Sequence, residues 1–203
     1  MKILAVSDEA VPGLWEYYTP DRVKGVDLII SCGDLQQEYL EFLTTVVNVP
    51  LLYVPGNHDQ SYEKRPPEGC IDIDGRVYEY KGLRIAGLGG SCRYKDGSYM
   101  YTERQMRARL WRLRRRIARK GGLDLFVTHA PARGYGDMED LAHRGFACFN
   151  DLLQKEKPAH MLHGHVHKSY TSRFKRERIH ESSTVIINCC GSYILEISEP
   201  VRI

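Results

Sequence analysis

Short hydrophobic runs that end close to metal-binding types of side chain are the most constraining feature of this 203-residue sequence. The five runs cover residues 2–6, 26–31, 51–54, 123–127 and 159–162. The polar residues that follow them are, in order, Asp8, Asp34, Asn57 with His58, His129, and the group His163, His165 and His167. Short apolar runs bounded by glycine or proline are typical of buried strands in a parallel sheet, where ligands bind beyond the carboxyl ends of the strands. If the runs form neighbouring strands, they bring carboxylate, amide and imidazole groups to one rim, which predicts a metal site with room for catalysis.

Size and charge set the class of protein. The chain is long enough to bury one sizeable core and shows no linker, so we expect a single domain over residues 1–203. Hydrophobic residues make up 42% and charged residues 27%, as in ordinary globular proteins. The formal charge of +3 is too small to require a polyanionic partner, although it suits an anionic substrate.

The N-terminus and the cysteines predict a cytoplasmic location. The N-terminal apolar stretch is shorter than a secretory signal, and no segment approaches the ~20 apolar residues of a membrane span, so no membrane partner is expected. Six cysteines are spread out without a Cys-x-x-Cys pair, which predicts reduced, buried thiols and no disulfide framework. Cys92, in the segment Gly89-Gly90-Ser91-Cys92, is the cysteine that we expect nearest to a cleft.

The middle of the chain changes from an alternation of strands and helices to a predicted antiparallel meander. Asp74-Gly75 separates residues 71–73 from residues 76–80, and this dipeptide predicts a type I′ hairpin between them. A further strand over residues 83–88 is expected to continue the meander.

Helices are expected over residues 38–47 and 147–155 and after Thr102. Thr102 and Gln105 form the pattern of a capping box, and Gly121-Gly122 ends the helix that follows. Its apolar residues at helical spacing are Met106, Leu110, Leu113 and Ile117.

The last third is expected to contain antiparallel strands at residues 170–173, 185–188 and 193–197. Two sheets packed face to face, with helices outside both, would accommodate this mixture of parallel and antiparallel strands.

Most of the polar motifs are weak when taken singly. Gly33-Asp34 and Gly56-Asn57-His58-Asp59 also suit tight turns whose side chains bind their own backbone. The segment His163-Gly164-His165-Val166-His167 is more specific, because a surface turn rarely needs three imidazoles at alternate positions. All of the candidates fall at strand ends in the same orientation, and this joint pattern favours a metal site.

The motifs resemble those of the calcineurin-like metallophosphoesterases, which are Asp-x-His, Gly-Asp, Gly-Asn-His-Asp/Glu, a lone His, and Gly-His-x-His. They stand here as Asp8-Glu9-Ala10, Gly33-Asp34, Gly56-Asn57-His58-Asp59, Thr128-His129 and Gly164-His165-Val166-His167. Four of the five are intact, and the resemblance runs from residue 1 to about residue 170. It implies an α/β (α+β) fold, a four-layer αββα sandwich of two mixed β-sheets flanked by helices, as in small bacterial members of the family.

The resemblance also implies a metal-dependent hydrolase of a phosphodiester or phosphomonoester that works by in-line attack of metal-activated water. The ligands that it implies for two divalent ions are Asp8 and His167 in the first site, Asn57, His129 and His165 in the second, and Asp34 as a bridge. Carboxylate, amide and imidazole ligands suit Mn, Fe, Zn or Ni, and Mn is preferred here. His58 is expected beside the leaving-group oxygen as a catalytic residue, with Asp59 orienting its ring.

One departure matters: Ala10 stands where the first motif has its histidine, so the first site is one protein ligand short and is expected to be weak or empty. Water, the substrate, Glu9 or His143 are candidates to complete it. Glu9 is disfavoured if the strand continues to this point, because neighbouring side chains on a strand point to opposite faces. A weakened two-metal site, a one-metal enzyme and a non-catalytic relative all stay open, and the intact second set with His58 favours catalysis.

The expected partner is a small phosphorylated or nucleotide-like substrate. Nine basic residues on the predicted helix over residues 103–120 favour a solvent-facing surface over a nucleic-acid site, because the net charge is small. A second basic stretch consists of Arg173, Lys175, Arg176 and Arg178, and a nucleic-acid substrate gains support only if both stretches flank the cleft. The alternative from another class is a non-catalytic protein-interaction module with a degenerate metal site, which would have no need of His58. The sequence leaves the oligomeric state open.

Overall fold

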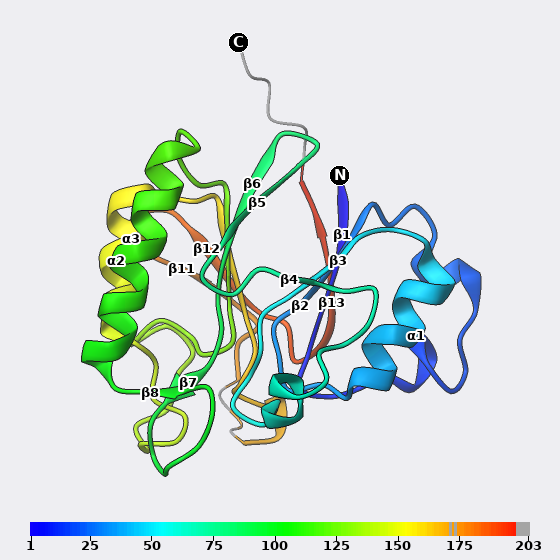
Figure 1. Cartoon of the computed structure of the whole chain (residues 1–203), viewed down its shortest axis with the longest axis horizontal. Helices are drawn as coiled ribbons and strands as arrows, with labels where there is room; N and C mark the ends of the chain where they lie inside the picture. Colours follow the sequence, from blue (N-terminus) through cyan, green and yellow to red (C-terminus); the bar gives the residue numbers. More distant parts are fainter. Residues whose placement is uncertain (171, 173, 198–203) are drawn as a thin grey trace.

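The computed structural model describes residues 1–170, 172 and 174–197, which form four layers (Figure 1). Helix α1 (Gln37–Val47) covers one side of a five-stranded sheet. A six-stranded sheet packs against the other side, and helices α2 (Glu103–Arg119) and α3 (Ala147–Glu156) cover its outer face. The predicted αββα sandwich of two mixed sheets is confirmed.

The first sheet has the strand order β13-β1-β2-β3-β4. Its strands are β1 (Lys2–Ser7), β2 (Leu28–Ser31), β3 (Leu51–Tyr53), β4 (Ile71–Asp72) and β13 (Gly191–Glu196). β1 to β4 are parallel, and β13 lies antiparallel to β1 at the edge.

The second sheet has the strand order β11-β12-β10-β9-β6-β5. Its strands are β5 (Val77–Tyr80), β6 (Leu83–Leu88), β9 (Leu125–Thr128), β10 (His160–His163), β11 (Glu177–Ile179) and β12 (Val185–Asn188). The four central strands are parallel, and the two edge strands are antiparallel to their neighbours. A separate ladder joins β7 (Ser91–Cys92) to β8 (Met100–Tyr101).

The five hydrophobic runs divide between the two sheets. Three form β1, β2 and β3 in the first sheet, and two form β9 and β10 in the second. They are therefore not neighbours in one sheet. The polar residues that follow them still meet, because the two sheets present these strand ends at the same edge of the sandwich, which lies at the bottom of Figure 1.

The predicted hairpin around Asp74-Gly75 is wrong. β4 pairs with β3 in the first sheet, whereas β5 pairs with β6 in the second. The turn itself exists, since the Arg76 N–H donates to the Ile73 carbonyl over 2.9 Å. Ile73 is buried between the sheets, and this burial directs the two strands into different layers, so the turn connects one sheet to the other. The pairing of β5 with β6 confirms the second half of the meander.

The C-terminal third is only partly antiparallel. β11 and β13 are antiparallel to their partners as predicted, but β12 runs parallel to β10. The predicted strand over residues 170–173 is not formed at its start, because Lys168–Tyr170 is a 3-10 turn, and Thr171 and Arg173 lie outside the described residues. Other 3-10 turns are found at Pro12–Leu14, Pro20–Val23 and Gln60–Glu63.

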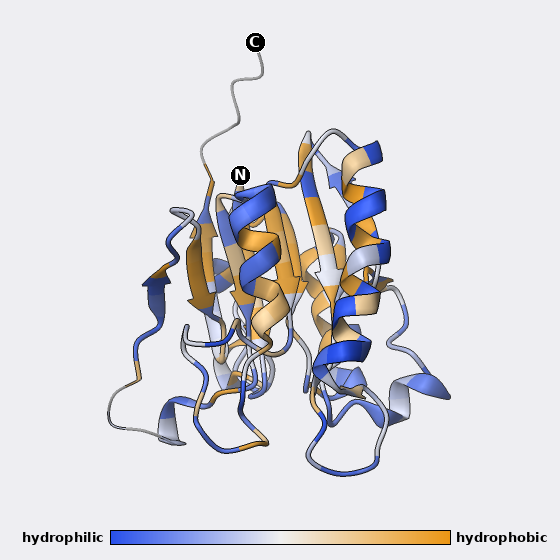
Figure 2. Cartoon of the chain, turned by 90° about the vertical axis from the view of Figure 1, so that its left-hand side faces the viewer, coloured by the Kyte–Doolittle hydropathy of each residue, from blue (hydrophilic) through white to orange (hydrophobic). Residues whose placement is uncertain are grey.

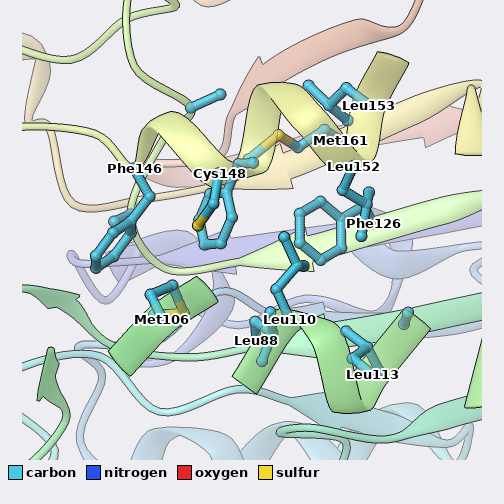
Figure 3. Packing of buried hydrophobic residues seen from close by; sticks show 14 of the residues in the cluster. Leu88, Met106, Leu110, Leu113, Phe126, Phe146, Cys148, Leu152, Leu153 and Met161 are labelled. Atoms are coloured by element: carbon cyan, nitrogen blue, oxygen red, sulfur yellow. The ribbon is translucent and has the colours of Figure 1, made fainter. Parts of the chain in front are cut away.

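Helix α2 begins as the sequence predicts. The Gln105 N–H donates to Thr102 Oγ1 over 3.3 Å, and the Thr102 N–H donates to Gln105 Oε1 over 2.9 Å, which completes the capping box. Its apolar stripe is buried against the second sheet. Figure 3 shows Leu110 of α2 and Leu152 of α3 on either side of Phe126 in β9.

Alternation along the strands fills the core on both faces of each sheet. In β1, Ile3 and Ala5 pack between the sheets, whereas Leu4 and Val6 pack toward α1. Sheets covered on both faces need such continuous apolar runs, and Figure 2 shows the central strands as largely hydrophobic between helices of mixed character. Among the described residues, no helix is both long enough and apolar enough to cross a membrane.

Candidate metal centre

The predicted ligands lie where the central strands of both sheets end. Asp8 follows β1, Asp34 follows β2, and Asn57 follows β3. His129 follows β9 and His165 follows β10 in the second sheet. The two groups are in direct contact, since the backbone N–H of His165 donates to Asp8 Oδ1 over 2.8 Å. Residues separated by more than 150 positions in the sequence are thus neighbours at this edge.

Asp34, Asn57, His129 and His165 face a common centre, and we call them the inner cluster. His129 Nε2 lies 3.2 Å from Asp34 Oδ2, 3.1 Å from Asn57 Oδ1 and 3.1 Å from His165 Nδ1. Asp34, His129 and His165 offer ligand atoms that all lie within 4.8 Å of one another. Asn57, His129 and His165 are buried, so the centre is shielded from bulk water.

The outer nitrogens of the two imidazoles are occupied by backbone carbonyls. His129 Nδ1 lies 2.8 Å from the Cys32 carbonyl, and His165 Nε2 lies 2.7 Å from the Ala142 carbonyl. A carbonyl only accepts, so each of these nitrogens donates, and the lone pair of the opposite nitrogen of a neutral ring points into the centre. Two imidazole lone pairs, a carboxylate and an amide oxygen therefore converge, and this set fits a divalent cation.

Electrostatics give the same result. Burial alone would lower the pKa of His129, but the carboxylates of Asp34 and Asp8 raise it to about 9. Burial would raise the pKa of Asp34, and His129 with the backbone N–H of His58 lowers it to about 2. Burial and the charge of His129 lower the pKa of His165 to about 3. The inner cluster thus attracts one positive charge and has an unprotonated imidazole beside it.

Three residues at this edge have left-handed backbone conformations. The φ angles are +64° for Asp8, +57° for Asp34 and +71° for His165. A left-handed conformation costs about 1–2 kcal/mol for a residue with a side chain, and such strain clusters at functional sites. The side chain of Asp8 is fully buried, and its Oδ2 atom has no hydrogen-bond partner.

Comparison with known proteins identifies the family. The model of the family described as calcineurin-like phosphoesterase matches residues 1–169. This chain belongs to the calcineurin-like phosphoesterases. The family implies divalent metal ions, and the inner cluster supplies ligands of a suitable kind.

Individual relatives of this phosphoesterase are distant. The UPF0046 protein T07D4.2 of Caenorhabditis elegans is 25% identical over 124 residues, which is 60% of this chain and 28% of that protein. The chain thus spans under a third of the length of this curated relative.

Solved structures share the fold. One crystal structure aligns with a TM-score of 0.67 at 16% identity, covering 96% of this chain and 94% of the other. The protein TT1561 of Thermus thermophilus aligns with a TM-score of 0.64 at 16% identity over 94% and 89% of the two chains. The 5'-nucleotidase of Candida albicans aligns with a TM-score of 0.51 at 13% identity, over 92% of this chain and 45% of that one.

Asp59 connects the loop that contains Asp34 to the loop that contains Asn57. Its Oδ2 atom accepts the N–H of Asp34 over 2.8 Å and the N–H of Gly56 over 2.7 Å. Burial and the charge of Asp34 raise the pKa of Asp59 to about 7. The resemblance implies that Asp59 orients the His58 ring. Among the described residues, the Asp59 side chain forms its hydrogen bonds with the backbone of Asp34 and Gly56, not with that ring. Its carboxylate fixes the Asp34 loop against the Asn57 loop instead.

His58 stands at the open side of the centre. The backbone N–H of His58 donates to Asp34 Oδ1 over 2.7 Å, and His58 is exposed to solvent. Gly56 must lack a side chain here, because an added Cβ would collide with the Asp34 carboxylate. The loop thus holds Asn57 inward and leaves His58 exposed.

The sequence analysis disfavoured Glu9 at the first site because its side chain was expected to point away, and this prediction is wrong. His167 Nδ1 lies 3.1 Å from Glu9 Oε1, so Glu9 points toward the predicted first site. β1 ends at Ser7, and the left-handed conformation of Asp8 ends the strand alternation on which the prediction rested. His167 Nε2 lies 4.0 Å from Asp8 Oδ1. Ala10 packs against the apolar cluster on the α1 side and offers no ligand.

Cys190 also lies at the centre, and the sequence reasoning missed it. Glu9, His167 and Cys190 offer ligand atoms within 4.8 Å of one another, and we call them the outer cluster. The sequence signal was incomplete. Cys190 closely follows the strand predicted over residues 185–188, but that strand was expected to be antiparallel, and its parallel pairing with β10 brings its end to this edge. Cys92, which was expected near a cleft, is instead buried in the cluster between α2 and the second sheet. The six cysteines are unpaired, as predicted.

Three further rings lie close to the ligands. The His143 ring centroid is 5.4 Å from that of His165, and His143 Nδ1 lies 2.9 Å from Asp140 Oδ1. Tyr170 stacks on His167 at 4.7 Å with an interplanar angle of 27°. His163 is buried beneath the loop, bonded to the Gly164 carbonyl, and burial lowers its pKa to about 4. His163 therefore belongs to the core.

A cavity of about 350 Å³ lies beside the His165–His167 loop. Val166 from this loop lines it, together with Phe174, Lys175 and Arg178. Part of the second basic stretch thus lines a cavity next to this loop, together with the acidic Asp137 and Glu139.

The arginines of α2 lie outside its buried apolar stripe, and three of the eight, Arg107, Arg109 and Arg114, form ion pairs with acidic residues. Arg109 binds Asp74 over 2.6 Å, and Arg107 binds Asp151 over 2.9 Å. Helix α2 lies in the outer layer of the sandwich, on the far side of the second sheet from the first (Figure 1). This placement supports the interpretation of α2 as a solvent-facing helix.

Proposed function

We propose that this phosphoesterase hydrolyses a small phosphate ester in a metal-dependent reaction. The observation that carries the proposal is the inner cluster, in which Asp34 Oδ2, Asn57 Oδ1 and His165 Nδ1 each lie 3.1–3.2 Å from His129 Nε2. A divalent cation at this point would bind the carboxylate oxygen, the amide oxygen and the imidazole nitrogens together, and would displace the proton that Asp34 and Asp8 hold on His129.

The ligands would hold two divalent cations, with Asp34 between them. Asn57, His129 and His165 complete the inner position, and Asp8 and His167 serve the outer one. When bound, the cations neutralise charge on a phosphoryl group and lower the pKa of water toward neutrality. Manganese is the cation that we propose, because oxygen and imidazole ligands without sulfur dominate the inner cluster.

His58 would assist departure of the leaving group. Its side chain is on the exposed side of the loop, while its backbone is anchored to Asp34. A protonated imidazole placed there donates its proton to the oxygen of the departing alcohol. Asp59 acts as a positioning residue, because its carboxylate holds the backbone of Asp34 and Gly56.

A nucleotide-like phosphomonoester or phosphodiester is the substrate class that we propose. The cavity beside the His165–His167 loop is lined by the basic Lys175 and Arg178, the acidic Asp137 and Glu139, and Phe174, so it offers charged groups of both signs and an aromatic ring to such a substrate. We propose that residues 1–203 act as one metallophosphoesterase domain. Six unpaired cysteines are consistent with a reducing, cytoplasmic location.

A screen of hydrolysis tests the proposal. The full chain would be loaded with manganese, analysed for metal content, and assayed with a generic aryl phosphomonoester and an aryl phosphodiester. We expect bound metal and turnover of at least one ester, lost on chelation and restored by manganese. Bound metal without turnover of either ester would favour the non-catalytic interaction module. Protein without metal would contradict the metal centre itself.

A further inference from the structure

We infer that the outer cluster of Glu9, His167 and Cys190 binds the first cation through a thiolate, replacing the imidazole that the family motif places at position 10. The inference rests on the two-cation centre proposed above. It makes that centre asymmetric, with one oxygen- and nitrogen-liganded position and one that contains sulfur.

The three ligand atoms are close enough to share one ion. They lie within 4.8 Å of one another, and the Glu9 Oε1 to His167 Nδ1 distance is 3.1 Å. Ligand atoms around a tetrahedral zinc ion stand roughly 3–4 Å apart, given metal–ligand distances of about 2.0–2.3 Å. A small closing movement of half-buried side chains would complete the shell.

The fold brings the three residues together from three strand ends. Glu9 follows β1, His167 follows β10, and Cys190 lies between β12 and β13. A β-bridge between Ser7 and Cys190 fixes the thiol beside the end of β1. Cys190 is fully buried, whereas Glu9 and His167 are half-buried, so the sulfur forms the floor of the site and the other two form its walls.

Asp8 provides an independent sign that a cation belongs here. Its side chain is fully buried, its Oδ2 atom has no hydrogen-bond partner, and its Oδ1 atom lies 4.0 Å from His167 Nε2. A buried carboxylate oxygen without a partner costs free energy, and a neighbouring cation would remove that cost. Asp8 thus supplies the negative charge next to the outer cluster.

Sulfur sets the class of metal. Thiolate and imidazole ligands favour zinc, and cobalt as its close analogue, over manganese or magnesium, which prefer oxygen. The inner cluster has no sulfur ligand among its four residues. The outer position is therefore expected to select zinc or cobalt even where the inner position holds manganese.

Cobalt spectroscopy tests the inference. The full chain, stripped of metal with a chelator, would be titrated with Co²⁺ while near-ultraviolet absorption from thiolate-to-cobalt charge transfer is recorded. We expect the band in the unmodified chain, its loss in Cys190→Ser, and its displacement by Zn²⁺ but not by equimolar Mn²⁺. Cys70→Ser is the matched control and should retain the band, because Cys70 is a half-buried thiol that packs against the α1-side cluster.

A second variant keeps the test valid if Cys190→Ser does not fold. Glu9→Gln keeps the thiol and the size of the side chain, so the band should persist with an apparent affinity for Co²⁺ lowered by about 10-fold or more. Unchanged affinity in Glu9→Gln, or a band that survives Cys190→Ser, would overturn the inference.

The readout separates the inference from the proposed function. Cobalt binding without the band, in a chain that hydrolyses esters, overturns the thiolate site and leaves the function intact. The band in a chain that hydrolyses nothing supports the thiolate site and removes the function. Absence of any cobalt binding overturns both.

Discussion

The inner and outer clusters are built differently although they lie side by side. The inner cluster is buried, and backbone carbonyls of Cys32 and Ala142 fix its imidazoles. In the outer cluster Glu9 and His167 are half-buried, and a carboxylate, not a carbonyl, occupies His167 Nδ1. Backbone groups thus fix the imidazoles of the inner cluster, whereas in the outer cluster a half-buried side chain holds His167. The family motifs that contribute to the inner cluster are intact, and the departure at Ala10 falls in the motif that contributes to the outer site.

The largest effect is expected from Asp34→Asn, which removes the charge of the carboxylate that we propose lies between the two cations. Hydrolysis should fall by roughly 10³-fold or more, and bound metal should be lost, because the carboxylate is the main counter-charge of the centre. Elemental analysis and turnover of an aryl phosphate would be measured together. Unchanged metal content would show that Asp34 is not between the cations.

His58→Ala separates chemistry from metal binding. We expect kcat to fall by about 10²–10⁴-fold, since a proton donor to the leaving group is lost, while metal content stays unchanged. Steady-state kinetics and elemental analysis of the same preparation check this. If the variant retained full turnover, His58 would have no part in the reaction.

Asp59→Ala distinguishes the role seen in the structure from the one the resemblance implies. Loss of the oxygen that accepts both N–H groups loosens the loops of Asp34 and Gly56, so metal affinity should weaken by about 10–100-fold. Equilibrium titration with Mn²⁺ measures it. If Asp59 acted by orienting the His58 ring, kcat would fall as in His58→Ala with metal affinity unchanged.

The smallest effect is expected far from both clusters, on α2. Arg107→Ala breaks an exposed ion pair with Asp151 and should change the free energy of unfolding by at most about 1 kcal/mol. Turnover should not change. Urea unfolding and oligonucleotide binding at two salt concentrations would be compared with the unmodified chain. A large, salt-dependent loss of oligonucleotide binding would instead make α2 a nucleic-acid surface.

Local sequence signals predicted the strand ends and the inner cluster well. Apolar runs predict β1, β2, β3, β9 and β10. The end of each strand then determines where the polar residues that follow it lie. The capping box at Thr102 is equally local, and it begins α2 where predicted. The roles of these residues as ligands remain a proposal.

Features that depend on tertiary contacts were not predictable in the same way. The two residues of β4 carry too little pattern to choose a sheet, and the burial of Ile73 decides it. The orientation of Glu9 depends on the left-handed conformation of Asp8, which no periodicity reveals. Cys190 was interpreted as one of several buried thiols, because the parallel pairing of β12 with β10 places it at the centre only in three dimensions.

Anomalous diffraction from crystals of the manganese-loaded chain tests the convergence of the inner cluster most directly. We expect a manganese peak bounded by Asp34 Oδ2, Asn57 Oδ1, His129 Nε2 and His165 Nδ1. A loaded crystal with no peak among these four atoms, or with their side chains turned away from one another, would contradict the metal centre on which the proposed function depends.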